Sequence, residues 1–338
     1  MHALRLAILS LAAVATAIAS VPKLMRAAAI DHAGDASALT LRTLPVPTPA
    51  PDEVLIALTA AGVASWDVSV RRHPEEIKNN KMPLVLGTDG AGVIAALGAN
   101  VHNFKIGEKV YAYSWDNPQG GFYADYVAVP AERVGPVPRG LSLIQAGGIA
   151  TTALTAIQGV DDALRVKAGT TLLIHGAAGG VGTLALQFAK LRGARVLATV
   201  SSEDEVALVK SLGAEAVVDG RHGDVTAAAR AFAPQGLDAV LALAPGDALE
   251  HGIDALKPGG LVAYPNGVHP VPKARSGVTI IAYDAIPGPK EYQRLNAAIK
   301  AAKLKVPIAA QFPLAQAAQA QERLEAGHVV GKIVLVIR

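Results

Sequence analysis

The sequence predicts an α/β protein in which an irregular, mostly β domain is followed by a doubly wound parallel sheet of about six strands. From about residue 151, short apolar runs alternate with segments of helical periodicity. That alternation is typical of a parallel sheet covered by helices on both faces. Before it, short strand-like runs are separated by Pro and Gly, as in an irregular β domain.

Composition excludes several classes of protein. Of the 338 residues, 51% are hydrophobic and 17% are charged, so the chain can bury a core and is not disordered. It contains no Cys, which excludes disulfides and cysteine-ligated metals. The net charge of +3 comes from scattered basic residues and only 4% of residues are aromatic, so we expect no nucleic-acid partner.

Residues 1–19 have the layout of a secretory signal peptide. A basic start precedes the uncharged run from Leu6 to Ala19, and small residues at Ala17 and Ala19 predict cleavage after Ala19. The run is too short for a permanent membrane span. The alternative is a true start at Met25, which opens the first strand of the β domain. The first interpretation predicts an exported or periplasmic protein and the second a cytoplasmic one.

In the β domain, residues 25–150, the expected strands begin at Met25 and continue with Glu53–Leu58, Lys109–Tyr113 and Phe122–Val129. In the doubly wound domain, residues 151–284, the expected strands are Thr171–Ile174, Arg195–Val200, Ala214–Val218, Ala239–Leu243, Gly260–Tyr264 and Val278–Tyr283. The expected helices between them are Gly180–Leu191, Glu203–Leu212, Val225–Phe232 and Leu249–Leu256. Residues 285–338, with a helix at Glu291–Ala302 and a strand at Lys332–Ile337, fall outside this alternation, so we expect them to return to the first domain.

The strand-to-helix turn LIHGAAGGVG, residues 173–182, predicts a dinucleotide site. Gly179 allows the backbone to approach a pyrophosphate, Gly182 allows the helix to pack closely, and the helix N-terminus offers free N–H groups. Ala177 stands where the usual fingerprint has its first Gly. The predicted cofactor-binding residues of this turn are Gly176, Ala177, Ala178, Gly179, Gly180, Val181 and Gly182.

The end of the second strand of this domain bears on the choice of nucleotide. An acid there would bind the ribose hydroxyls of NAD, but the strand runs into Ser201 and Ser202, whose hydroxyls can donate to a 2′-phosphate. This favours NADPH and leaves NADH open. Glu203, Asp204 and Glu205 follow and would repel a phosphate that they faced. Alternatively, they form the acidic first turn of a helix capped by Ser202.

Several motifs in order resemble the zinc-independent quinone oxidoreductases of the medium-chain dehydrogenase/reductase superfamily. The motifs are PLVLGTDGAGVI (83–94), GGFYADYVAVP (120–130), HGAAGGVG (175–182), KSLGAEAVVD (210–219), LKPGG (256–260) and GHVVGKIVLVI (327–337). The resemblance implies a Rossmann domain, a GroES-like catalytic domain, a cleft between them and, in many members, a homodimer. We expect Thr155 to begin the interdomain helix, and the resemblance places it beside the nicotinamide.

The resemblance also predicts that no metal is bound. In zinc-dependent relatives the ligands occupy positions that correspond here to Ala64, Thr88 and a residue near Thr151. A catalytic zinc needs three protein ligands, and this set does not supply them. The chain also departs from the zinc-free branch, in which many members carry Asn at Ala64 and some carry Lys at Glu205 to hold the 2′-phosphate.

These features together predict hydride transfer to a quinone or an α,β-unsaturated carbonyl, in which the cofactor carries the difficult step and no general acid is obligatory. Ser65, Asp67 and Tyr113 are the catalytic candidates, although Asp67 could instead brace the backbone. Leu243, Ala244 and Asn266 follow strand ends, where the cofactor cleft should lie. His175 is interpreted as structural, and Arg71 and Arg72 as solvated. An enoyl-thioester reductase and a non-catalytic NADPH-binding protein remain alternatives.

Overall fold

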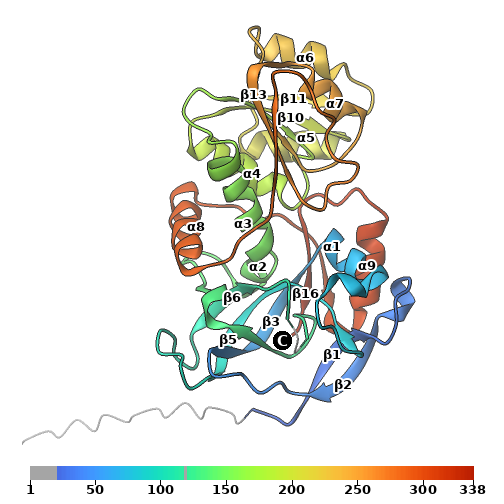
Figure 1. Cartoon of the computed structure of the whole chain (residues 1–338), viewed down its shortest axis with the longest axis vertical. Coiled ribbons are helices and arrows are strands. Elements are labelled where there is room, and N and C mark those ends of the chain that lie inside the picture. The colour runs from blue at the N-terminus through green and yellow to red at the C-terminus, as the bar shows by residue number, and fades with distance from the viewer. Residues whose placement is uncertain (1–20, 118–119) are drawn as a thin grey trace, which may run out of the picture.

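The computed structural model describes residues 21–117 and 120–338, so the predicted signal peptide lies outside the described residues. None of the helices within those two ranges is long and apolar enough to cross a membrane. The described chain has two parts along its long axis (Figure 1). The upper part contains a six-stranded sheet and the lower part a seven-stranded one.

The six-stranded sheet is parallel throughout, with the order β11-β10-β9-β12-β13-β14, which confirms the predicted doubly wound Rossmann architecture. Its strands are β9 (Thr171–His175), β10 (Arg195–Val200), β11 (Ala216–Asp219), β12 (Leu237–Ala242), β13 (Leu256–Pro265) and β14 (Thr279–Tyr283). Its helices are α4 (Gly182–Leu191), α5 (Glu203–Leu212), α6 (Val225–Phe232) and α7 (Asp247–Ile253). Successive residues of β9 point to opposite faces, because Leu172 packs with α4 whereas Leu173 packs with α6 and α7.

The lower part is mostly β, as predicted, and most of its strands pair antiparallel. The seven-stranded sheet contains β3 (Glu53–Val63), β5 (Asp89–Leu97), β6 (Lys109–Tyr113), β7 (Tyr126–Pro130), β8 (Val134–Pro136), β15 (Ile308–Pro313) and β16 (Lys332–Val336). A separate three-stranded sheet contains β1 (Leu24–Ile30), β2 (Thr40–Pro45) and β4 (Leu84–Val85). Helix α1 (Ser65–Arg72) and helix α9 (Ala317–Glu325) lie beside each other in this part (Figure 1).

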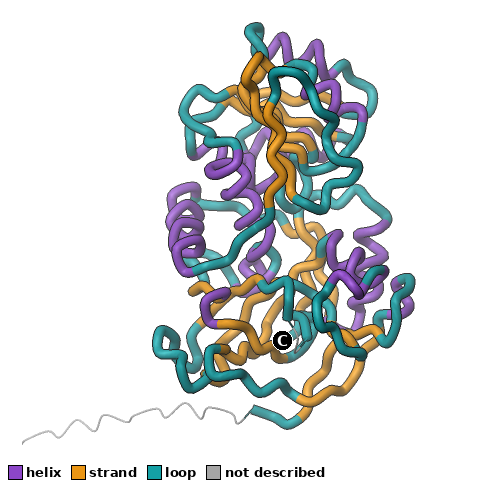
Figure 2. The backbone as a smooth tube through the Cα atoms, viewed as in Figure 1, coloured by secondary structure: helices purple, strands orange, loops and turns teal. Residues whose placement is uncertain are grey.

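Helices and the chain tail connect the two parts (Figure 2). Helix α2 (Leu143–Gly147) packs on β3, and α3 (Ala150–Gln158) follows it upward to pack against α4. Helix α8 (Pro289–Ala302) packs on α3 and α4, and the chain then re-enters the lower sheet. There β16 pairs antiparallel with β3, with Ile333 opposite Val63.

Three local expectations were wrong. The strand expected at Phe122–Val129 starts only at Tyr126, because the N–H groups of Phe122 and Tyr123 donate to Gly87 and Leu86 instead. The helix expected at Leu249–Leu256 ends at Ile253, and Leu256 already pairs with Leu237 as part of β13. Arg71 is not solvated. Its side chain is fully buried and bonds both carboxylate oxygens of Glu325 at 3.0 Å and Gln321 Oε1 at 2.6 Å.

Candidate functional site

The turn between β9 and α4 is shaped by its glycines. Gly176 has a φ of +81°, a left-handed conformation that favours Gly. A Cβ on Gly182 would lie 2.6 Å from the carbonyl oxygen of Ala177 and still closer to that of Gly176, so a side chain there would force the backbone apart. A Cβ on Gly179 would meet only the Gly176 oxygen, at 3.5 Å, which leaves space above this residue.

The same turn presents unpaired backbone donors. Within the described part of the chain, the N–H groups of Val181 and Gly182 have no hydrogen-bond acceptor, whereas that of Thr183 donates to Gly179. Free N–H groups at the start of a ten-residue helix, next to the open space above Gly179, suit a pyrophosphate. The side chains of Ala177 and Ala178 are buried in the core, so only their backbone can face a cofactor. The turn therefore fits a dinucleotide.

The ends of the neighbouring strands lie beside this turn. The Leu243 N–H donates to the His175 carbonyl at 3.1 Å, and Leu243 and Ala244 are the nearest side chains to Gly176. The structure thus brings these two predicted residues to the nucleotide turn. His175 is buried, its Nδ1 lies 2.9 Å from Thr199 Oγ1, and burial lowers its pKa, as in a structural residue. Asn266 follows β13, and its amide donates to Asp284 Oδ2 at 2.7 Å.

At the end of β10, two predicted hydroxyls point to carboxylates. Ser201 Oγ donates to Glu205 Oε1 at 2.9 Å, and the Ser201 N–H donates to Glu205 Oε2 at 2.6 Å. Ser202 is the N-cap residue of α5, but its hydroxyl donates to Asp204 Oδ1 and makes no capping bond. Sequence reasoning placed Glu205 in the first helical turn and missed that its side chain folds back to the strand end.

The catalytic candidates occupy different environments. Ser65 is exposed at the start of α1. Tyr113 is half-buried at the end of β6, and burial, with smaller contributions from Asp284 and Asp89, raises its pKa to about 12. Thr155 was expected to begin the interdomain helix, which is wrong, because α3 starts five residues earlier, at Ala150.

Asp67 is a bracing residue. Its side chain is buried, and Oδ2 accepts hydrogen bonds from the Ala64 N–H at 2.9 Å and the Tyr123 hydroxyl at 3.0 Å. The first of these bonds fixes the start of α1, which is the alternative role considered for Asp67. Burial and then the nearby Asp89 raise the pKa of Asp67 to about 7.

The buried side chain of Lys332, which sequence reasoning missed, lies near Asp67 and Asp89. Lys332 begins β16, and its Nζ donates to the Val63 carbonyl at 3.3 Å. Burial lowers the pKa of Lys332, while Asp89 and Asp67 act in the opposite direction. The carboxylate of Asp89 also accepts the Thr151 N–H at 2.9 Å. The available signal was a lone Lys opening the apolar run KIVLV at residues 332–336.

The residues at the positions of the zinc ligands do not fit a zinc ion. Ala64 offers no donor atom, and Thr88 Oγ1 is taken by the indole N–H of Trp66 at 2.7 Å. Thr151 supplies only a neutral hydroxyl, and the buried side chain of Lys332 lies near Asp89. Among residues 21–117 and 120–338, no group of three or more His, Cys, Asp or Glu side chains could hold a metal ion.

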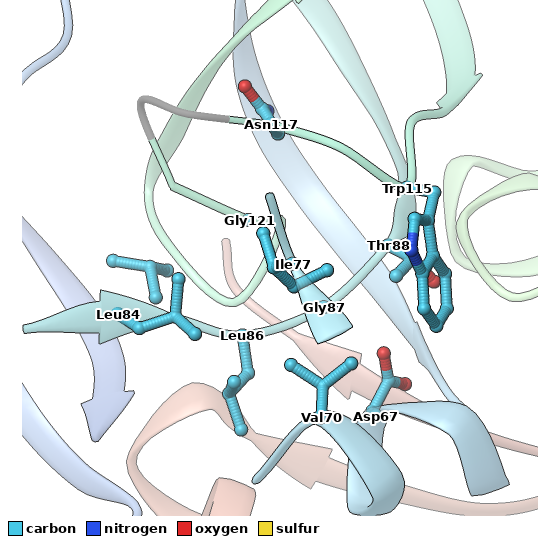
Figure 3. Close-up of a pocket in the computed structure, with 11 residues that line it drawn as sticks. Asp67, Val70, Ile77, Leu84, Leu86, Gly87, Thr88, Trp115, Asn117 and Gly121 are labelled. Atoms are coloured by element: carbon cyan, nitrogen blue, oxygen red, sulfur yellow. The ribbon is translucent and has the colours of Figure 1, made fainter. Parts of the chain in front are cut away.

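Asp67, Asp89 and Lys332 form a buried cluster, which residues 331 and 332 connect to the nucleotide turn. The Gly331 N–H donates to the Ala178 carbonyl at 2.9 Å, and a Cβ on Gly180 would lie 2.7 Å from the Lys332 side chain. A pocket lined in part by Asp67 lies in the lower part (Figure 3). Polar Asp67 and Thr88 share its wall with Trp115 and with apolar residues of α1 and the β4 region.

Comparisons with known proteins agree with this architecture. Residues 50–139 match the alcohol dehydrogenase GroES-like domain, and residues 212–335 match a family described as zinc-binding dehydrogenase. Human quinone oxidoreductase is 30% identical over 93% of this chain and 98% of its own length. The chloroplastic NADPH-dependent alkenal/one oxidoreductase of Arabidopsis thaliana is 31% identical over 95% of this chain and 81% of its own length.

A solved structure, the quinone oxidoreductase from Coxiella burnetii, superposes with a TM-score of 0.82 at 32% identity and covers 94% of this chain and 100% of that one. The full-length similarity, the parallel sheet and the glycine-shaped turn agree with one another. The chain therefore belongs to the quinone oxidoreductase-like branch of the medium-chain dehydrogenase/reductase superfamily, a branch of NAD(P)H-dependent oxidoreductases.

Proposed function

We propose that this protein transfers hydride from a reduced nicotinamide nucleotide to a quinone or an α,β-unsaturated carbonyl, without zinc. The proposal rests on one combination of features. The turn between β9 and α4 fits a dinucleotide, and the residues at the positions of the zinc ligands of zinc-dependent relatives do not fit a metal ion. Similarity to proteins named quinone oxidoreductase and alkenal/one oxidoreductase supports this acceptor class.

The residues of the chain bind and orient in this proposal. The N–H groups of Val181 and Gly182 hold the pyrophosphate, and Leu243 and Ala244 line the dinucleotide cleft at the strand ends. The nicotinamide, when bound, supplies the hydride. The acceptor then takes one proton from water, so a hydroquinone or a saturated carbonyl is released.

Tyr113 and Ser65 are the side chains offered to the acceptor. The raised pKa of Tyr113 keeps its phenol protonated at neutral pH, so the hydroxyl can donate a hydrogen bond to a carbonyl oxygen. Ser65 contributes an exposed hydroxyl at the start of α1. Asp67 acts through the backbone of α1 and is a positioning residue.

The reaction class does not depend on which nucleotide carries the hydride, because NADH and NADPH differ only in the 2′-phosphate. The sequence favours NADPH, and one relative is NADPH-dependent by name. The test is oxidation of both nucleotides by the purified protein with a quinone panel and an enone panel, before and after treatment with a zinc chelator. Chelator-resistant turnover supports the proposal. Turnover only with an enoyl thioester, or tight nucleotide binding without turnover, would replace it with one of the alternatives.

A further inference from the structure

A carboxylate lies at the carboxyl end of the second strand of the Rossmann sheet, although no acid stands there in the sequence. Glu205 belongs to the first turn of α5, but both of its oxygens accept bonds from Ser201, one from the N–H and one from the hydroxyl. The Glu205 side chain is only 10% exposed, so it is held in this position. Two hydrogen bonds and burial thus fix a negative charge at the end of β10.

The surroundings of Glu205 are acidic. Asp204 precedes it and accepts the Ser202 hydroxyl, and Glu203 is exposed on the same turn. Among the described residues, the basic side chain paired with these acids is His328, whose nitrogens lie 3.4 Å from Asp204 and from Glu205. No Lys or Arg in the described ranges forms an ion pair with Asp204 or Glu205.

The serine hydroxyls are not free for a phosphate. A serine hydroxyl has one proton to donate, and those of Ser201 and Ser202 are donated to Glu205 and Asp204. A 2′-phosphate would have to displace these bonds and also approach two carboxylates. The 2′-hydroxyl of NADH can instead donate a hydrogen bond to a carboxylate oxygen, as acids at this strand end do in NAD sites.

We propose that Glu205 is a specificity-determining residue that makes the site prefer NADH over NADPH. The inference rests on the proposed nucleotide site and reverses the preference favoured by the sequence, which treated the end of β10 as free of acid. The Ser201–Glu205 pair accepts the ribose hydroxyls and repels a 2′-phosphate.

The test measures the dissociation constants of NADH and NADPH for the full chain by fluorescence titration, without an acceptor. AMP and adenosine 2′,5′-bisphosphate serve as fragments that differ only in the 2′-phosphate. For the unaltered protein, we expect at least tenfold tighter binding of NADH than of NADPH. Glu205→Gln, which keeps the side-chain shape and removes the charge, should reduce that ratio at least tenfold, and Glu205→Lys should invert it.

Glu203→Gln is the matched control, because it removes one negative charge from the same turn at an exposed side chain. It should leave the ratio of the NADPH and NADH dissociation constants within about twofold. A change seen only in the Glu205 variants would show that the contact made by Glu205, and not the overall charge of the turn, sets the preference. Equal or tighter binding of NADPH by the unaltered protein would overturn the inference, as would an unchanged ratio in Glu205→Gln. Nucleotide selectivity without turnover of any acceptor would refute the proposed reaction and leave this inference standing. Binding of neither nucleotide would refute both.

Discussion

Substitutions at two glycines of the nucleotide turn should have different effects, one on the stability of the fold and the other on the binding of the cofactor. In Gly182→Ala the new methyl group would meet backbone oxygens at 2.6 Å or less, and backbone cannot rotate away as a flexible side chain can. Overpacking of this kind costs about 1–3 kcal/mol of folding free energy. In Gly179→Ala the nearest atom is 3.5 Å away, an ordinary contact, so we expect a change within about 0.5 kcal/mol.

The effects on binding should not follow the effects on stability. The methyl group of Gly179→Ala occupies the space left for the pyrophosphate, so both NADH and NADPH should bind at least tenfold more weakly, about 1.4 kcal/mol. The assay pairs urea unfolding of the nucleotide-free protein with fluorescence titration of both nucleotides for each variant. Wild-type affinity in Gly179→Ala, or wild-type stability in Gly182→Ala, would refute this interpretation of the turn.

Three further predictions concern the lower part of the fold. Arg71→Ala should lower the free energy of unfolding by about 2–5 kcal/mol in urea, because it empties the space of a fully buried side chain and leaves the buried Gln321 oxygen without its donor. Arg72→Ala, at an exposed side chain, should change it little. The raised pKa of Asp67 means that its stabilisation, present below pH about 4, is lost as pH rises through about 7. Asp67→Asn should therefore remove a decline of about 2 kcal/mol between pH 5 and 7, measured by urea unfolding. Tyr113→Phe should lower kcat/KM for the acceptor about tenfold with unchanged nucleotide affinity, whereas Tyr111→Phe, which loses a bond to a neighbouring helix, should not lower it.

The periodic parts of the chain were predictable, and the folded-back side chains were not. Strand β10 and helix α5 have the bounds expected from their apolar spacing, because a buried parallel strand and an amphipathic helix leave strong local patterns. The direction of Glu205 depends on the torsions of one side chain and on a backbone N–H four residues away. Lys332 is buried against β3, a strand that lies far away in the sequence. Such contacts have no periodic signature.

The zinc-independent reaction that we propose requires the catalytic domain to hold together without a metal ion, and the buried cluster of Asp67, Asp89 and Lys332 offers a way to do so. In a metal site, a cation would neutralise acids such as Asp89 and fix the loops that carry them. Here the buried Lys332 amine lies near Asp89, and Asp89 accepts the Thr151 N–H at the start of α3, the helix that leads to the nucleotide domain. A Lys side chain has no vacant coordination position for a substrate oxygen. It can support the interface between the domains but cannot polarise an alcohol as zinc does. This arrangement supports the proposed reaction, because hydride transfer to an acceptor that is already electrophilic needs no Lewis acid.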